Sequence, residues 1–200
     1  MGSEALEYST KELTSDTLPD FERLFEKHPA PGAYMCWCLY HQRTRPVAPT
    51  KGPESRAKRA ARNRREKRGL LEDGRAHGIL VYLKGEPVGW CQYGPKEELP
   101  LIDTDRDYRR LAGKGDIKRL WRITCFVVDT KYRSRGVASA ALRAALEAIR
   151  NKGGGVVEAY PNIRWGAYRE YLGTRSMFRK EGFEVVAPYG KSNVVMRRTL

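Results

Sequence analysis

The sequence lacks any apolar run of the roughly 20 residues that a membrane-spanning helix needs. Its first residues contain no basic segment followed by an apolar one, so a secretory signal is not expected. Cysteine is scarce, and its four residues form no spaced framework. We therefore expect reduced thiols, a cytoplasmic protein and no membrane partner. The cysteines are Cys36, Cys38, Cys91 and Cys125.

Several binding motifs are also missing. Neither the Gly-x-x-x-x-Gly-Lys-Ser/Thr loop of nucleotide kinases nor the Gly-x-Gly-x-x-Gly fingerprint of dinucleotide-binding folds occurs. No helix-turn-helix, zinc-finger or RNA-binding aromatic signature is visible. The stretch from Cys36 to His41 contains metal-ligand residue types, but no second Cys/His pair follows at the spacing of a closed zinc site. We predict that the chain binds no metal.

Acidic residues are outnumbered, because 38 lysines and arginines face 24 aspartates and glutamates and give a formal net charge of +14. This excess predicts an anionic partner, namely a phosphate-bearing small molecule, a nucleic acid or an acidic acceptor. A chain of 200 residues can bury a core without disulfide staples. We therefore expect residues 1–200 to form a single domain.

Hydrophobic patterning predicts a mixed order of helices and strands. Phe21, Leu24 and Phe25 fall on one face of a short helix, and Ala141, Leu142 and later apolar residues repeat at helical spacing in a second one. The predicted elements are a helix at 15–28, a partly extended aromatic stretch at 34–40, a basic helix at 51–72, a hairpin at 78–93, an irregular charged connection at 95–119, a strand–helix–strand unit at 121–160, a last helix at 165–180, and strands at 183–186 and 194–198.

The basic segment at 51–72 is rich in alanine, arginine and lysine, which favour helix. A helix that is polar on nearly all sides is either solvated or awaits a ligand. The favoured interpretation is a solvated basic helix beside the functional site, because charge runs usually face solvent. The alternative is a clamp for an anionic substrate or RNA, with residues 51–68 guiding it.

The strand–helix junction after Val128 predicts a phosphate cradle. A helix N-terminus presents unpaired backbone N–H groups and the positive end of the helix dipole. Gly136 allows the backbone to approach a phosphate closely, and the side chains of Arg133 and Arg135 can bind phosphate oxygens.

The spacing Arg133-x-x-Gly136-x-Ala138 resembles the acetyl-CoA motif of the GNAT N-acetyltransferase superfamily. The flanking strands and the stretch from Tyr171 to the Gly182-Phe183 exit are similar to the same family, and the resemblance covers most of residues 78–200. It implies an α/β (α+β) fold with a mixed, mostly antiparallel sheet of six or seven strands. The fourth and fifth strands would form a central parallel pair that splays apart, with helices on both faces.

The resemblance implies an enzyme that moves acetyl from acetyl-CoA directly to an amine, with the 95–119 connection on the acceptor side. In the family a bulge in the fourth strand frees amides for the pantetheine and the thioester carbonyl, and Phe126, Val127 and Val128 match that place. The residues that the resemblance assigns to acetyl-CoA are Phe126, Val127, Val128, Arg133, Ser134, Arg135, Gly136, Val137, Ala138 and Ser139.

The acid and the base are less clear. Phe178 occupies the position where the family usually has a tyrosine that protonates the CoA thiolate, and its ring has no proton to give. Tyr171 and Tyr168, expected on the same last helix, are the alternative acids, while aromatic packing is the competing role for both. Glu158 is the candidate base, and an ion pair with an arginine is its competing role.

The acceptor stays open at this point. A small-molecule amine is favoured, and an amine on a protein or an RNA-linked group is the alternative. A non-enzymatic nucleic-acid-binding module ranks third, because nucleic-acid binding rests on the basic segment alone. The sequence also leaves a homodimer open.

Overall fold

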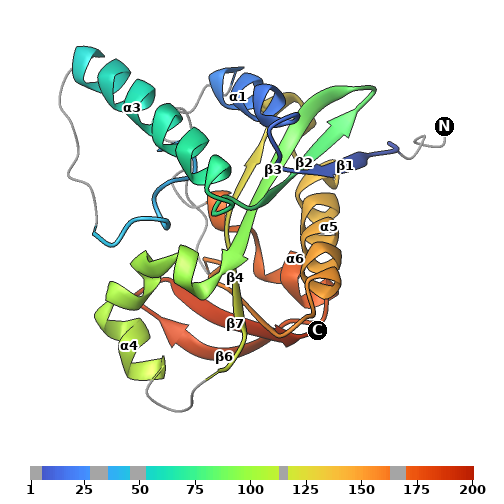
Figure 1. Cartoon of the computed structure of the whole chain (residues 1–200). Helices are drawn as coiled ribbons and strands as arrows, with labels where there is room; N and C mark the ends of the chain where they lie inside the picture. The colour runs from blue at the N-terminus through green and yellow to red at the C-terminus, as the bar shows by residue number, and fades with distance from the viewer. Residues whose placement is uncertain (1–5, 28–35, 46–52, 113–116, 163–169) are drawn as a thin grey trace.

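The computed structural model describes residues 6–27, 36–45, 53–112, 117–162 and 170–200. Within these residues, seven strands form a sheet in the order β1-β2-β3-β4-β5-β7-β6, with helices on both faces (Figure 1). Only β4 and β5 pair in parallel, so the predicted mixed α/β architecture is confirmed. The strands are β1 (Ser9–Glu12), β2 (Gly78–Leu83), β3 (Glu86–Pro95), β4 (Leu120–Val128), β5 (Val156–Ala159), β6 (Glu184–Tyr189) and β7 (Asn193–Thr199).

Helices fill the connections. The α-helices are α1 (Leu18–Lys27), α3 (Pro53–Glu72), α4 (Arg106–Ala112), α5 (Val137–Asn151) and α6 (Arg175–Lys180). Short 3₁₀ turns are η1 (Lys96–Glu98), η2 (Pro100–Thr104), η3 (Thr130–Tyr132) and η4 (Glu170–Leu172).

Helix α5 covers one face of the sheet. Its apolar stripe, which includes Ala141, Leu142 and Ile149, is fully buried against β2, β3 and β4. The periodic pattern therefore predicted the buried side correctly. The helix ends before Gly153–Gly155, whose positive φ angles suit glycine.

Helix α1 covers the opposite face through an aromatic cluster. Phe21 and Phe25 have ring centroids 4.3 Å apart, and Phe21 packs edge-on against Trp90 of β3 at 4.7 Å. The Trp90 ring leaves no space beside it, because a Cβ added at Gly78 would lie 1.9 Å from it. A side chain at position 78 would displace the indole that joins α1 to the sheet.

The basic helix α3 is present, but it is not solvated on all sides. Glu22 of α1, which is only 6% exposed, accepts hydrogen bonds from Arg64 and Arg68. Asn63 and Lys67 of α3 are buried. Part of the positive charge of α3 is therefore used to dock it against α1.

We expect Glu22→Gln to weaken this docking. Burial alone would raise the pKa of Glu22, but the hydrogen bonds and charges of Arg64 and Arg68 lower it to about 2. This carboxylate therefore stabilises the fold fully above its unfolded pKa of about 4.3, and the contribution is lost as pH falls toward 2. Glu22→Gln should lower the free energy of unfolding by about 1.5–3 kcal/mol at pH 7, measured in urea.

The deficit of Glu22→Gln should shrink between pH 4.5 and 2. Glu26→Gln is the matched control, because Glu26 also pairs with Arg64 but is largely exposed. Its effect should stay below about 1 kcal/mol. Equal losses in the two variants would mean that the buried position of Glu22 carries no special weight.

Three expected segments differ from the structure. In the aromatic stretch at 34–40, Cys36 is helical and turns follow it, with Trp37 and Cys38 at φ of 50°, instead of the partly extended conformation expected. The connection at 95–119 is more regular than expected, since η1, η2 and α4 occupy most of it. The last helix does not run through 165–180, because Gly173 at φ 73° separates η4 from α6.

Candidate active site

The predicted phosphate cradle lies at the start of α5, where the chain leaves β4. Gly136 is the N-cap residue, with φ of 88°, and no side chain caps the helix. The first amides of α5 are therefore not satisfied by a capping side chain. A Cβ built at Gly136 meets nothing within 4 Å, so the turn opens to solvent.

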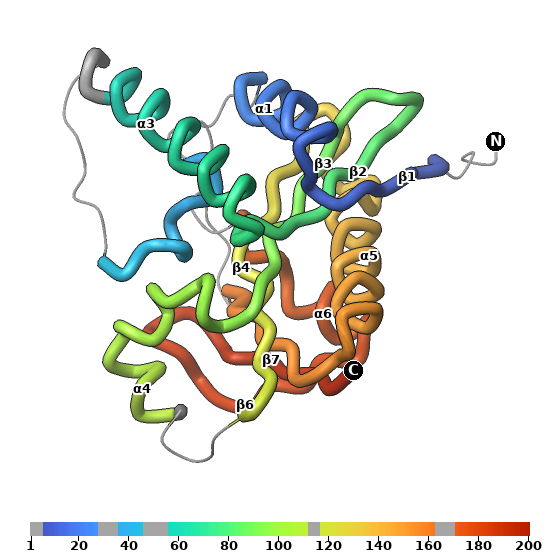
Figure 2. Tube along the Cα trace, viewed as in Figure 1, coloured from blue at the N-terminus to red at the C-terminus, as the bar shows by residue number. Residues whose placement is uncertain are grey.

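The turn before α5 is held from two sides. Asp129 accepts a hydrogen bond from the backbone N–H of Lys131 at 3.0 Å. Tyr8, just before β1, donates its hydroxyl to the carbonyl of Arg135 at 2.9 Å. Figure 2 shows β1 and the start of α5 side by side although they are far apart in the sequence. Arg133, Ser134 and Arg135 are exposed around this turn, and Ser134 has φ of 58°.

Strand β4 contains a bulge, but it lies at Thr124 and not at Phe126, Val127 and Val128, the place that the resemblance implied. Gln92 of β3 pairs with Cys125 and Tyr93 pairs with Ile123, so Thr124 is the extra residue. Phe126, Val127 and Val128 pair regularly with β3. The pairing of β4 with β5 ends at Ile123 and Ala159. The strand edge from Thr124 to Val128 therefore lies beyond the last residue pair with β5.

Tyr171 and Phe178 lie on opposite faces of β4. Phe178 is fully buried and packs edge-on against Phe126 at 6.0 Å, on the α5 side. Tyr171, in η4, packs against the cluster on the α1 side that contains Val127. Tyr171 lies in η4 and Phe178 in α6, so the expectation of one last helix that carries both positions is wrong. Tyr168 lies outside the described residues.

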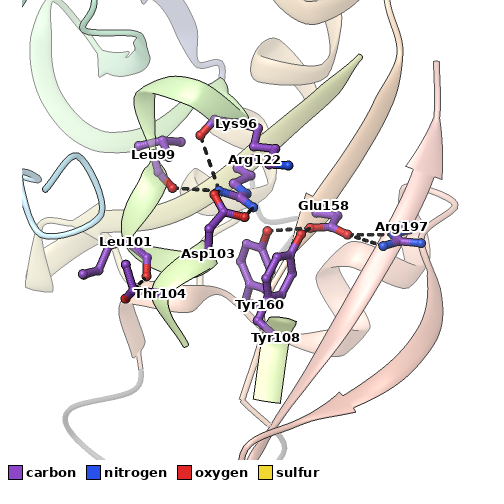
Figure 3. Close-up of polar contacts among 10 residues, drawn as sticks. All are labelled: Lys96, Leu99, Leu101, Asp103, Thr104, Tyr108, Arg122, Glu158, Tyr160 and Arg197. Carbon is purple, nitrogen blue, oxygen red and sulfur yellow. Dashed lines mark hydrogen bonds and ion pairs between the residues drawn. The ribbon is translucent and has the colours of Figure 1, made fainter. Parts of the chain in front are cut away.

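Glu158 is the centre of a buried polar network (Figure 3). One carboxylate oxygen accepts hydrogen bonds from the hydroxyls of Tyr108 at 2.6 Å and Tyr160 at 2.7 Å. The other oxygen accepts a hydrogen bond from the guanidinium of Arg197 at 2.7 Å. The side chain has no exposed surface. The competing role of Glu158, an ion pair with an arginine, is therefore present, and its oxygens are occupied by partners.

The same network contains Arg122, which lies beside Glu158 in the register of β4 and β5. Instead of pairing with Glu158, Arg122 binds Asp103 through two nitrogens at 2.7 and 2.8 Å and the carbonyl of Leu99 at 2.8 Å. It thereby anchors η1 and η2 to the sheet. Sequence patterning did not raise this role, and an arginine inside an apolar strand is the only signal for it.

We expect Glu158→Ala to be strongly destabilising. It removes the acceptor for Arg197 and for the hydroxyls of Tyr108 and Tyr160, all within a buried cluster. Loss of one partner of a buried ion pair typically costs about 3–5 kcal/mol. Denaturant unfolding should show a loss of that size. Glu147→Ala, on the exposed face of α5, should change the free energy of unfolding by less than about 0.5 kcal/mol. A loss below about 1 kcal/mol for Glu158→Ala would mean that the network is not formed in solution.

His41 is a further polar group near this network that patterning did not single out. Burial, followed by the charge of Arg122, lowers the pKa of His41 to about 4. Its Nδ1 has no hydrogen-bond partner among the described residues. The ring is therefore neutral at neutral pH, and burial and the charge of Arg122 oppose its protonation.

Neither a metal cluster nor a membrane span is found in the part of the chain that the structure describes. No group of three or more His, Cys, Asp or Glu side chains in this part could hold a metal ion. None of its helices combines the length and apolarity of a membrane span.

Comparison with known proteins gives a consistent result. The model of the acetyltransferase (GNAT) family matches residues 39–173. The search of curated proteins gave no match. Among solved structures, the chain is similar to mosquito arylalkylamine N-acetyltransferase like 5b, with a TM-score of 0.61 and 10% identity over 97% of this chain and 100% of that one.

Two bacterial structures give similar values. An acetyltransferase from Thermus thermophilus has a TM-score of 0.52 and 17% identity, over 99% of this chain and 100% of that one. A GNAT family N-acetyltransferase from Escherichia coli, solved in complex with CoA, has a TM-score of 0.53 and 13% identity, over 100% of this chain and 84% of that one. At these identities the structures show the shared fold.

Proposed function

The chain belongs to the acetyltransferase (GNAT) family, and we propose that it uses acetyl-CoA to acetylate an amine by direct attack. The amine nitrogen forms a bond to the carbonyl carbon of the thioester and loses a proton to water, the carbon–sulfur bond breaks, and the CoA thiolate takes up a proton. The acceptor that we favour is a small-molecule amine.

The observation that carries this proposal is the start of α5. A 15-residue helix begins at an uncapped glycine in a turn with two exposed arginines, which suits the pyrophosphate of CoA. The bound CoA in the Escherichia coli relative supports the same donor. In the proposal Arg133, Ser134, Arg135 and Gly136 hold the phosphates together with the backbone amides of Val137, Ala138 and Ser139.

Backbone groups of β4 would hold the other end of acetyl-CoA. Phe126 and Val127 are buried, so their side chains are part of the core. Their backbone groups lie on the edge of β4 beyond its last residue pair with β5. An amide there is a suitable donor to the oxyanion of the tetrahedral intermediate. Tyr171 is the proposed acid for the thiolate. Glu158 has all its oxygens occupied, so we assign it to holding Tyr108 and Tyr160 rather than to removing a proton.

The docking of α3 bears on the alternative acceptors. Arg64 and Arg68 are engaged by Glu22, while Arg62 and Arg65 are exposed. Less of the basic segment is thus available to guide a protein or RNA-linked amine than the sequence suggests. This favours the small-molecule acceptor and a single domain without a separate nucleic-acid-binding part.

Two measurements on the purified chain test the proposal. Calorimetry should show that acetyl-CoA binds. An assay of free thiol release should then find turnover with amines from a panel of small amines, lysine peptides and aminoacyl-RNA. A folded protein that binds neither acetyl-CoA nor CoA would overturn the proposed donor. Turnover only with the peptides or the RNA would replace the proposed acceptor class.

A further inference from the structure

Cysteines from two distant segments meet on the α1 side of the sheet. Cys38 lies in the turn after α1, and Cys125 follows the bulge of β4. Gln92 of β3 brings them together: its side-chain amide donates to the carbonyl of Cys38 at 2.7 Å, and Cys125 is its partner residue across β3 and β4. Cys125 also packs against the cluster that contains Cys38. Cys125 is partly exposed, whereas Cys38 is 2% exposed, so solvent approaches the pair from the side of Cys125.

The surroundings of Cys38 favour a thiolate. The indole N–H of Trp90 donates to its sulfur at 3.2 Å. Burial alone would raise the pKa of Cys38, but the contact with Cys125, the charge of Lys67 and the hydrogen bond from Trp90 together lower it. The same contact with Cys38, followed by burial, raises the pKa of Cys125 well above its usual value. Cys38 is therefore the more acidic thiol of the two and the one that more readily becomes a thiolate.

Lys67 supplies the cation of this cluster. Its side chain comes from α3, is 1% exposed, and donates to Gln42 at 2.7 Å and weakly to the carbonyl of Cys38 at 3.5 Å. Among the described residues, no carboxylate forms an ion pair with Lys67. Burial lowers the pKa of Lys67, and the negative charge of Cys38 is the largest effect that opposes this lowering.

The other two cysteines lack this arrangement. Cys91 is buried in the core on the α5 side, and burial raises the pKa of its thiol well above the usual value. Cys36 lies in the same turn as Cys38, and burial followed by the nearby Cys38 raises its pKa. All four cysteines are free thiols in the structure. Cys38 and Cys125 thus differ from the other two cysteines because they lie beside each other and near the side chain of Lys67.

We propose that Cys38 and Cys125 form an oxidisable dithiol, a modification site that takes hydrogen peroxide and closes to a disulfide. The Cys38 thiolate attacks one peroxide oxygen, hydroxide leaves, and Cys38 becomes a sulfenic acid. The Cys125 sulfur then attacks the Cys38 sulfur, and water leaves as the disulfide forms. Two thiols lose two electrons in total, and the peroxide is reduced to two waters.

The disulfide would join the turn of Cys38 to β4 directly after the bulge at Thr124. This is the point where β4 leaves β5. If the proposed acetyl transfer takes place at that edge, oxidation would also change turnover, and reduction would restore it. The dithiol itself can be tested without any assay of acetyl transfer.

The test is peptide mapping after treatment of the whole chain with hydrogen peroxide. Thiol titration should fall from four to two, and digestion without reductant should yield a peptide that joins Cys38 to Cys125. Dithiothreitol should restore all four thiols. A disulfide that involves Cys36, or peroxide treatment that leaves four thiols or yields only a sulfinic acid, would overturn the proposal.

Two variants test the assignment further. Cys91→Ser should form the disulfide as the wild type does, because Cys91 faces the other side of the sheet. Lys67→Met keeps the length of the side chain and removes the charge, so the thiolate fraction of Cys38 should fall. Oxidation at neutral pH should then slow about tenfold for each unit by which the pKa rises. An unchanged rate in folded Lys67→Met would remove Lys67 from the site.

Discussion

Gly136→Asp is expected to abolish CoA binding while the protein stays folded. The added carboxylate would stand at the uncapped start of α5, where the proposal places a pyrophosphate, and like charges repel strongly at close range. A Cβ at this position has room, so the core should not be disturbed. Calorimetry with CoA should show at least a 100-fold loss of affinity, a cost of about 3 kcal/mol.

Gly74→Asp is the matched control for this variant. Gly74 has φ of 70°, a Cβ there also meets nothing within 4 Å, and it is exposed in the turn before β2. It therefore reproduces the backbone strain and the added charge away from α5. Circular dichroism should show both variants folded. Retained CoA affinity in Gly136→Asp, or equal losses in both variants, would contradict the proposed cradle.

The central unit of the fold was predictable because local rules determine it. The apolar spacing of α5, the largely apolar run of β4 and the glycines at 153–155 each favour one local conformation. The cradle follows from the same rules, since Gly136 stands between a strand and a helix. Local signals were weaker for the end of the chain, where Gly173 divides the expected helix.

Long-range pairing explains what sequence patterning missed. The docking of α3 depends on Glu22 and Arg68, which lie 46 residues apart, and the network of Glu158 joins β5 to α4 and β7. Hydrophobic periodicity carries no information about which charged side chains pair across such long separations in the sequence. The buried Lys67 is the clearest case, because its place in a basic run predicts exposure, while the fold packs it against Gln42 and Cys38.

Tyr171 approaches β4 from the face opposite to Phe178, which occupies the position of the family's usual acid. Phe126 and Val127 point to opposite faces of β4, since neighbours in a strand alternate. Phe178 packs with Phe126, and Tyr171 packs in the cluster of Val127. If Tyr171 protonates the thiolate, its hydroxyl would reach the sulfur from the α1 side, opposite to the face that Phe178 occupies.

Tyr171→Phe removes only the hydroxyl, so the packing against the Val127 cluster should survive. Loss of a general acid typically costs about 10²–10⁴-fold in turnover. We expect a fall in kcat of about 10²-fold, because water can replace the donor in an open site, with little change in the KM for acetyl-CoA. Tyr82→Phe is the control. Tyr82 lies on β2, two strands away from β4, and its hydroxyl donates to Asp20 of α1, so its loss should leave kcat unchanged. Full turnover in Tyr171→Phe would make Tyr171 a packing residue, and the proton would then come from another donor.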